Sequence, residues 1–142
     1  MEPVPINVSA VLAAAMAKIA VEFIWHGPLF DKVWMQWSGM TAGEITAANK
    51  TGSGKAHFLA FVGSVAMSYA LALSLVFASA YYDMGGVRAG VMCGFWNWLG
   101  FIAPVTLGTV MWEGKPWKLW LILNSSYLVS LLIMGVILAL WK

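Results

Sequence analysis

Three ionisable side chains lie one helical turn apart in the first apolar run of the sequence. Lys18, Glu22 and His26 follow at intervals of four residues, so a helix places them on one face. Lysine and glutamate at this spacing can pair, and a charge inside a membrane span costs about 2.5–3.5 kcal/mol. The pair therefore predicts a contact within the bundle, a contact with another subunit, or a path for an ion or solute.

Other polar side chains in the later apolar runs fall at a similar depth. Counting helical rise places three of them at about the level of Lys18, namely Ser64, Asn124 and Ser125. Asn97 falls nearer the middle of the run. These depths allow a polar cluster that links the first, second and fourth runs. A transport path would instead be lined by Lys18, Glu22, Asn97 and Asn124.

A metal site is a further interpretation of the same region. Glu22, His26 and His57 would supply a carboxylate and two imidazoles, a ligand set that suits transition metals. No serine, histidine and carboxylate set lies at one depth for nucleophilic catalysis. Cys93, the single cysteine, is interpreted as a packing residue. We therefore expect no catalytic residues and no cofactor.

The composition indicates a membrane protein. Of the 142 residues, 61% are hydrophobic and 10% are charged, whereas globular domains carry about a quarter charged residues. Four runs are long enough to cross a bilayer as helices, and they cover about residues 6–26, 58–80, 87–112 and 117–141. We predict an all-α integral membrane protein with one four-helix transmembrane domain in contact with lipid. The net charge of +2 does not suggest nucleic acid.

Residues 28–54 predict an interfacial segment between the first two spans. Its apolar side chains follow a helical period, at Phe30, Val33, Trp34 and Trp37. Pro28 suits the start of this helix and Gly39 suits its end. Thr41 and Glu44 match a capping box, which predicts a second short helix to about residue 50. Residues 51–55 are then expected to form a flexible lead into the second span.

The ends of the spans indicate an orientation. Five lysines lie at the end that carries the 27–57 connection, against two basic residues at the other end. The positive-inside rule then predicts both termini outside and the 27–57 connection in the cytoplasm. The N-terminus lacks the basic start of a signal peptide, so the first run is expected to be retained. We expect an aromatic belt from Trp25, Trp34, Trp37, Trp112, Trp117, Trp120 and Trp141.

Small residues at four-residue spacing predict the faces on which the spans pack, because close backbone approach drives helix association in lipid. The residues are Ala10 and Ala14, then Ala60, Ser64 and Ser68, then Gly86, Gly90 and Gly94. The fourth span carries larger side chains and is expected at the periphery or turned to a partner. Pro104 predicts a kink in the third span, where Thr106 or Thr109 can bond carbonyls.

Segment 25–34 resembles segment 112–120, since each has tryptophan, glycine, proline, lysine and tryptophan in that order. This likeness predicts two parallel hairpin repeats, or it reflects residues common where spans leave the membrane.

The chain resembles a family of small four-span prokaryotic membrane proteins known as domain of unknown function 1761. The matching segments are residues 7–12, 25–34, 98–104, 113–116 and 124–141. The resemblance implies a four-helix membrane fold and no particular activity. In that family the position of Glu22 is usually small and that of His26 is usually tyrosine, and Lys18 also departs from the pattern. The resemblance thus implies that the charged residues are a specialisation, such as a contact with a partner.

Together these features predict a non-catalytic accessory or assembly subunit of a membrane complex, or a small homo-oligomer. A transporter or channel is the alternative, and a metal-dependent membrane enzyme is the second alternative.

Overall fold

The computed structural model describes residues 5–141, apart from the side chains of residues 31, 34, 38, 42, 45 and 48–53. Helices are the only regular elements in this described part of the chain. Four segments are long and apolar enough to cross a membrane: Val8–Leu29, Gly54–Tyr82, Gly86–Met111 and Trp117–Leu140. The predicted all-α, four-span fold class is confirmed.

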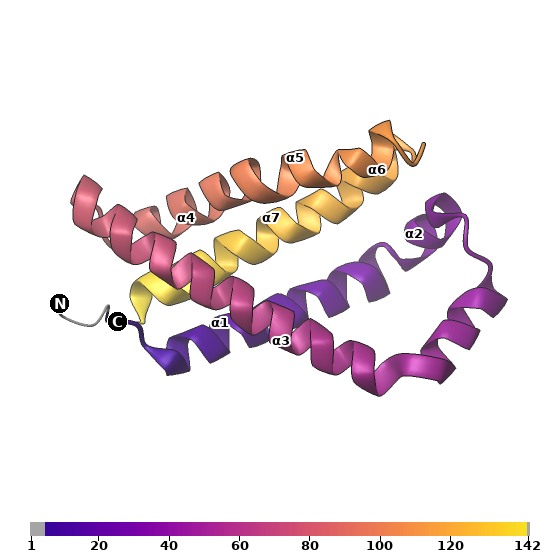
Figure 1. The fold of residues 1–142 in the computed structure, drawn as a ribbon, viewed down its shortest axis with the longest axis horizontal. Coiled ribbons are helices and arrows are strands. Elements are labelled where there is room, and N and C mark those ends of the chain that lie inside the picture. The colour runs from indigo at the N-terminus through magenta and orange to yellow at the C-terminus, as the bar shows by residue number, and fades with distance from the viewer. Residues whose placement is uncertain (1–4, 142) are drawn as a thin grey trace.

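Helix α7 (Trp117–Leu140) lies at the centre of the bundle. Figure 1 shows it between α1 (Val8–Ile24) and the broken third span, with α3 (Ala42–Tyr82) crossing in front. The expected peripheral position of the fourth span is wrong. The physical reason is that α7 carries small residues on two faces, Ser126 and Ser130 on one and Gly135 on the other, so neighbours approach it from both sides.

The two ends of the described chain lie together at one end of the bundle, and α2 (Asp31–Ser38) lies at the opposite end (Figure 1). Helix α1 begins where the Asn7 side chain accepts hydrogen bonds from the amides of Ser9 and Ala10. It runs on into a π-helical turn, η1 (Trp25–Leu29), that contains Pro28. The expectation that Pro28 starts the interfacial helix is therefore wrong. Gly39 ends α2 with a φ of 75°, as predicted.

Helix α3 begins at the predicted capping box. The Thr41 amide donates to Glu44 Oε2 at 2.7 Å, and the Glu44 amide donates to Thr41 Oγ1 at 3.3 Å. The helix then runs for 41 residues without interruption, so the predicted flexible lead at residues 51–55 is wrong. Each glycine there costs only about 1 kcal/mol relative to alanine, too little to break a helix that is capped at one end and membrane-bound at the other.

The third span is broken into four pieces. They are α4 (Gly86–Asn97), the π-helical turn η2 (Trp98–Ile102), α5 (Ala103–Thr106) and α6 (Gly108–Met111). Pro104 stands at the start of α5, where its missing N–H removes a helical hydrogen bond. The Thr106 hydroxyl donates to the Ile102 carbonyl at 2.7 Å and the Thr109 hydroxyl to the Thr106 carbonyl at 2.8 Å. Both threonines bond carbonyls beside the break.

The closest helix contact joins α4 to α7. A Cβ atom added to Gly90 would overlap the Gly135 carbonyl, and one added to Gly94 would lie 2.5 Å from the Leu131 carbonyl oxygen. Ala10, Ala14, Ser64 and Ser68 are also buried in the bundle. Two of the predicted packing residues are corrected. Ala60 is exposed, because α3 has left the bundle there, and Gly86 has open space at its Cβ position, because it starts α4 at the surface.

The two segments paired as a repeat differ in local structure. Trp25 begins a π-helical turn and is partly buried, whereas Trp112 follows α6 and is 85% exposed. The closer local equivalence is with Trp98, which begins the second π-helical turn. Both turns start with tryptophan, any residue and glycine, Trp25-His-Gly27 and Trp98-Leu-Gly100. The equivalent pieces of the first and third spans are therefore 25–29 and 98–102.

Candidate functional site

Lys18 and Glu22 form an ion pair inside the membrane-spanning part of α1. Lys18 Nζ donates to Glu22 Oε1 at 2.7 Å. The lysine side chain is 8% exposed and the glutamate side chain is 27% exposed. No donor from the described part of the chain reaches the other carboxylate oxygen, Oε2. The lysine of this pair is thus buried, whereas the glutamate carboxylate is partly exposed.

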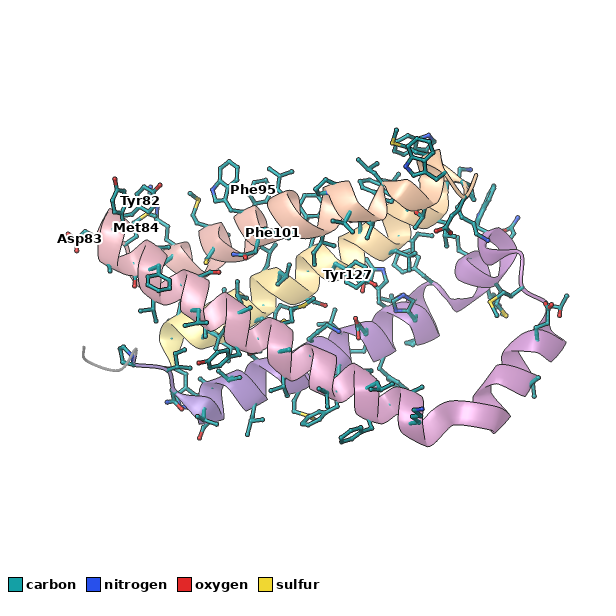
Figure 2. All side chains as sticks on the ribbon, in the orientation of Figure 1. Tyr82, Asp83, Met84, Phe95, Phe101 and Tyr127 are labelled. Atoms are coloured by element: carbon teal, nitrogen blue, oxygen red, sulfur yellow. The ribbon has the colours of Figure 1, made fainter. Side chains whose placement is uncertain are left out.

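Helix α7 lies behind this pair. The Trp25 indole donates to the Ile122 carbonyl at 3.0 Å, and the antiparallel course of α1 and α7 then places Glu22 level with about residue 125. Tyr127 is within electrostatic range of Glu22, and Figure 2 shows it between α7 and α1. The hydroxyls of Ser126 and Ser130 are fully buried and have no hydrogen-bond partner among the described residues.

Helix α3 covers only one half of this face of α1. The Ser68 hydroxyl donates to the Val11 carbonyl at 2.8 Å, which fixes the crossing point. Beyond Ser64, toward the α2 end, every residue from Gly54 to Gly63 is exposed. Ten consecutive helical residues point in all directions, so this half of α3 has left the bundle. Figure 1 shows the two helices diverging toward the α2 end.

The residues of the predicted polar cluster lie in separate parts of the bundle. The Ser64 hydroxyl donates to the Ala60 carbonyl, and the Ser125 hydroxyl donates to the Leu121 carbonyl, each within its own helix. Neither links two spans. The expected cluster across the first, second and fourth spans is therefore wrong, because serine hydroxyls in helices can bond the carbonyl four residues earlier.

Asn124 instead joins α7 to the broken third span. Its Nδ2 donates to Thr106 Oγ1 at 2.9 Å, and the Trp120 indole donates to the same oxygen at 3.1 Å. The Trp98 indole donates to the Asn124 carbonyl at 3.1 Å. Asn124 is 2% exposed, so this network is sealed. Its function is to hold α5 and η2 against α7.

Asn97 lies elsewhere, between α3 and α4. Its Nδ2 donates to the Cys93 carbonyl at 2.9 Å, and the Ser74 hydroxyl lies 3.4 Å from its Oδ1. Two hollows of about 540 and 500 Å³ meet at Ser74 and Asn97. Neither is lined by Lys18, Glu22 or Asn124. Of the four residues of the transport alternative, these two hollows thus contain only Asn97.

The candidate metal ligands do not come together either. The His26 Nδ1 atom lies 3.0 Å from the Glu22 carbonyl oxygen of its own helix, and the Glu22 side chain binds Lys18. His57 lies on the exposed half of α3. Among the residues that the structure describes, no three His, Cys, Asp or Glu side chains are grouped to hold a metal ion. The candidate ligand set of Glu22, His26 and His57 is therefore not assembled, because His57 lies on the half of α3 that is apart from α1.

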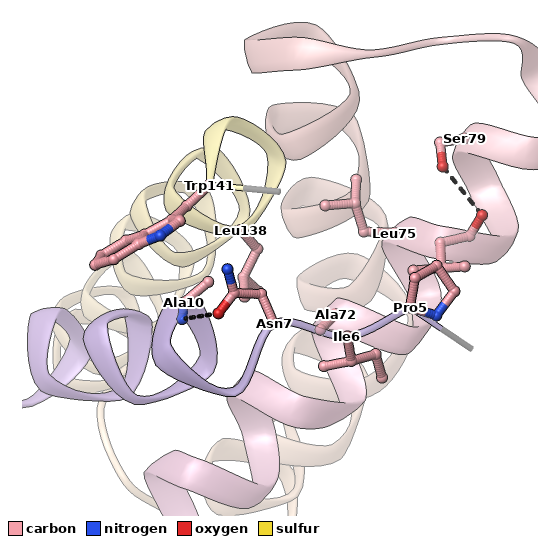
Figure 3. Close-up of a pocket in the computed structure, with 10 residues that line it drawn as sticks. Pro5, Ile6, Asn7, Ala10, Ala72, Leu75, Ser79, Leu138 and Trp141 are labelled. Atoms are coloured by element: carbon pink, nitrogen blue, oxygen red, sulfur yellow. Dashed lines mark hydrogen bonds between the residues drawn. The ribbon is translucent and has the colours of Figure 1, made fainter. Parts of the chain in front are cut away.

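A third hollow of about 280 Å³ lies at the other end of the bundle, between the start of α1, α3 and the end of α7. Figure 3 shows its lining, which is mostly apolar. The Asn7 amide oxygen there caps α1, and the Ser79 hydroxyl donates to the Val76 carbonyl. Both polar groups are already bonded, so the hollow presents a mainly apolar surface.

The predicted aromatic belt is partly corrected. The indoles of Trp25 and Trp120 donate into the bundle, since partners within it lie in reach, and they do not face headgroups. Trp112, Trp117 and Trp141 are exposed at the ends of the spans. The Trp37 ring lies 4.9 Å from Lys118 Nζ, which joins α2 to the start of α7. The Trp34 side chain lies outside the described residues.

Fold and site together define a four-span helical membrane protein in which buried Ser68 and Asn124 bond neighbouring helices. The family model described as protein of unknown function (DUF1761) matches residues 9–139. The chain belongs to this family. No curated protein and no solved structure matches the chain.

Several residues of these networks escaped prediction. The packing roles of Gly135, Ser126 and Ser130 were not predicted, because bulky residues surround them in the sequence. The Ser-x-x-x-Ser spacing is a small-residue pattern that could have indicated a contact face. Trp98 and Tyr127 gave no comparable signal, because their roles depend on which helix lies opposite.

Proposed function

We propose that this protein is a non-catalytic accessory or assembly subunit that binds other membrane polypeptides or further copies of itself. The observation that carries the proposal is the departure of α3 from the bundle between Gly54 and Gly63. This stretch is about 15 Å long, half the thickness of the hydrocarbon core. It leaves the Glu22 face of α1 uncovered over the depth of one leaflet.

Lipid tails can cover the exposed apolar side chains of α3, but they offer no hydrogen bond to a carboxylate. Glu22 is partly exposed, and among the described residues Lys18 alone donates to its carboxylate. Polar groups inside a membrane are costly when unpaired, and protein neighbours are their usual partners. A binding role thus accounts for both the uncovered helix face and the ion pair beside it. The sealed Asn124 network and the separate Asn97 hollows give less support to a transport path.

The cellular placement is part of the same proposal. The exposed lysines Lys32, Lys55 and Lys118 lie at the α2 end of the bundle. By the positive-inside rule this end faces the cytoplasm of a prokaryotic inner membrane, and both termini face outside. The uncovered face of Glu22 then lies in the cytoplasmic leaflet.

Purification in mild detergent tests the proposal. The expected result is a complex, either with a stoichiometric membrane protein or with further copies of the chain, as measured by native mass spectrometry of protein extracted from its own membranes. A monodisperse monomer with no co-purifying protein in several mild detergents would overturn it. A chain purified after solubilisation in a harsh detergent serves as the dissociated control.

A further inference from the structure

We infer that the seam between α3 and the third span binds an uncharged, membrane-soluble alcohol of the quinol type, whose ring hydroxyl donates a hydrogen bond to Asn97 Oδ1. The inference does not rest on the proposed binding of other polypeptides. Ser74 and Asn97 line both hollows of this seam, which measure about 540 and 500 Å³. Ligand pockets have volumes of about 300–1,000 Å³ and a few polar groups in an apolar lining. The seam has the size and the lining of a ligand site.

The two hollows follow one another along α3. The 540 Å³ hollow is lined on α3 by side chains at four-residue intervals from Ser74 to Tyr82, and the 500 Å³ hollow continues from Ser74 back to Met67. The helical rise from Met67 to Tyr82 is about 22 Å. Figure 2 shows Tyr82 near the turn between the two spans and Phe101 farther along the bundle. An occupant of both hollows is therefore elongated, with Ser74 and Asn97 beside its middle.

Asn97 Oδ1 is an acceptor in this seam without a donor of its own. The Ser74 hydroxyl carries one hydrogen and has two acceptors in reach, the Ala70 carbonyl at 3.0 Å and Asn97 Oδ1 at 3.4 Å. The shorter bond lies within α3, so Asn97 Oδ1 has at most the longer contact. Asn97 Nδ2 donates to the Cys93 carbonyl at 2.9 Å, and exchanging the amide N and O atoms would set two oxygens against each other. A ligand that complements this site therefore brings a hydrogen-bond donor.

The charge and the depth of the seam do not suit a phospholipid headgroup. Among the described residues that line the two hollows, none carries a charged side chain. Asn97 lies about 16 Å along the third span from Gly86, and Ser74 lies about 12 Å along α3 from Tyr82. The hydrocarbon core is about 30 Å thick, so both residues lie near its middle, where charges are strongly unfavourable. The polar group that reaches Asn97 is therefore uncharged.

The linings of the two hollows differ, and they assign the two ends of the ligand. The 540 Å³ hollow is lined by Tyr82, Trp96, Met84 and Met92, and aromatic and thioether side chains suit a flat ring. Alanine, leucine and isoleucine make up most of the apolar lining of the 500 Å³ hollow, which suits a tail. Asn97 lies where the hollows meet, so the hydroxyl must stand beside the point where the tail joins the ring. A quinol carries a hydroxyl there, whereas a quinone carries only acceptor oxygens.

The test compares 2-decylphenol, in which the hydroxyl lies beside the tail, with its methyl ether, which has no donor. Binding of tritiated 2-decylphenol to the purified full chain in nanodiscs is measured by scintillation proximity, and empty nanodiscs give the background from partition into lipid. Saturable binding is expected, and the methyl ether should compete about 3- to 10-fold more weakly, the range for one hydrogen bond in a membrane. The absence of saturable binding, or equal competition by the ether, would overturn the inference and leave the seam to lipid tails.

Two variants separate the hydrogen bond from the shape of the seam. Asn97→Leu removes the acceptor at similar volume, so the phenol and its ether should bind this variant with equal affinity. Ser74→Ala removes the competing hydroxyl, so the ligand becomes the only donor to Asn97 Oδ1, and the preference for the phenol should persist or increase. Loss of the preference in Ser74→Ala, or its persistence in Asn97→Leu, would contradict the assigned bond.

A pair of bulky variants covers the case in which Asn97→Leu fails to fold. Ala78→Phe fills part of the 540 Å³ hollow, whereas Ala80→Phe adds the same bulk at an exposed position of α3 that lines neither hollow of the seam. Only Ala78→Phe is expected to abolish saturable binding of 2-decylphenol, with the thermal midpoints of both purified variants as the control for folding. Equal binding to the two variants would show that the ligand does not occupy this seam.

Discussion

Individual residues hold this bundle together through backbone approach and through tryptophan and amide hydrogen bonds. Gly90 and Gly135 bring two backbones into contact. The Trp25 and Trp98 indoles each donate to a carbonyl of α7, two residues apart. Since hydrophobic burial gives little drive between helices in lipid, such contacts carry much of the specific association.

Gly90→Ala is expected to destabilise the bundle by about 1–3 kcal/mol, the usual cost of overpacking. The added methyl group would meet the backbone carbonyl of Gly135, which cannot move aside as a flexible side chain would. Gly63→Ala is the matched control, because open space surrounds its Cβ position on α3. That change is expected to be neutral or slightly stabilising, since alanine favours a helix over glycine. Thermal unfolding in detergent measures both, and an unchanged midpoint for Gly90→Ala would contradict the close contact.

Thr106→Val is expected to cost about 1–2 kcal/mol, because it removes the shared partner of the Asn124 amide and the Trp120 indole. Thr109→Val is the control, since the one described bond of that hydroxyl goes to the Thr106 carbonyl within the same span. A double-mutant cycle with Asn124→Leu should show a coupling energy of about 1 kcal/mol, measured by unfolding in mixed micelles. Additive effects would show that Thr106 and Asn124 do not act together.

At the scale of elements, sequence patterns predicted what depends on one segment alone. Run length and hydropathy gave the four spans, and local chemistry gave the Gly39 end of α2 and the Thr41–Glu44 capping box. What depends on two segments was missed. To predict the central position of α7, one must know that Gly135 faces Gly90. To exclude the candidate metal ligands, one must know where α3 diverges from α1.

Only part of the candidate site was predicted from the sequence. The Lys18–Glu22 pair follows from spacing within one helix and is present. The partners of Asn124 and Asn97 lie on other helices, and a depth count cannot tell which helix is adjacent. Serine spacing was ambiguous for a further reason, because a hydroxyl can bond its own helix as readily as a neighbour. Side-chain contacts within one helix can therefore be predicted from this sequence, whereas contacts between helices cannot.

The start of α3 is expected to loosen in acid. The backbone hydrogen bond at Thr41, with that of the Thr41 side chain, holds the pKa of the Glu44 carboxyl below its ordinary value. A lowered folded-state pKa stabilises this helix end above the ordinary carboxyl range, and the contribution is lost as pH falls through the folded-state value. A nitroxide label on Gly43→Cys, in a Cys93→Ser background, should gain mobility between neutral pH and about pH 3. Glu44→Gln should abolish the pH response, and an equal response in that variant would assign it to another group.

At the scale of the whole molecule, the fold has one closed end and one open end. Near the termini, α3 packs against α1 and α7, whereas toward α2 it leaves them. Polar groups follow this division, since Ser68, Ser126 and Ser130 are fully buried and Glu22 is partly exposed where α3 diverges. The described bundle is thus closed at the end near the termini and open at the α2 end, and the orientation of the chain decides in which leaflet a partner would bind under the proposed function.

The orientation can be tested with two single cysteines in a Cys93→Ser background. Gly85 lies in the exposed turn between α3 and α4, and Glu113 lies in the exposed turn before α7 at the opposite end. The lysine excess at the α2 end predicts that this end stays in the cytoplasm. In intact bacterial spheroplasts, a membrane-impermeant maleimide should therefore label Gly85→Cys, and it should label Glu113→Cys only after permeabilisation. The reverse pattern would move Glu22 and the uncovered face of α1 to the outer leaflet, and equal labelling of both cysteines would mean that the chain inserts in two orientations. Only the expected pattern places the uncovered face of α1 in the cytoplasmic leaflet, where the proposed function would place the partner.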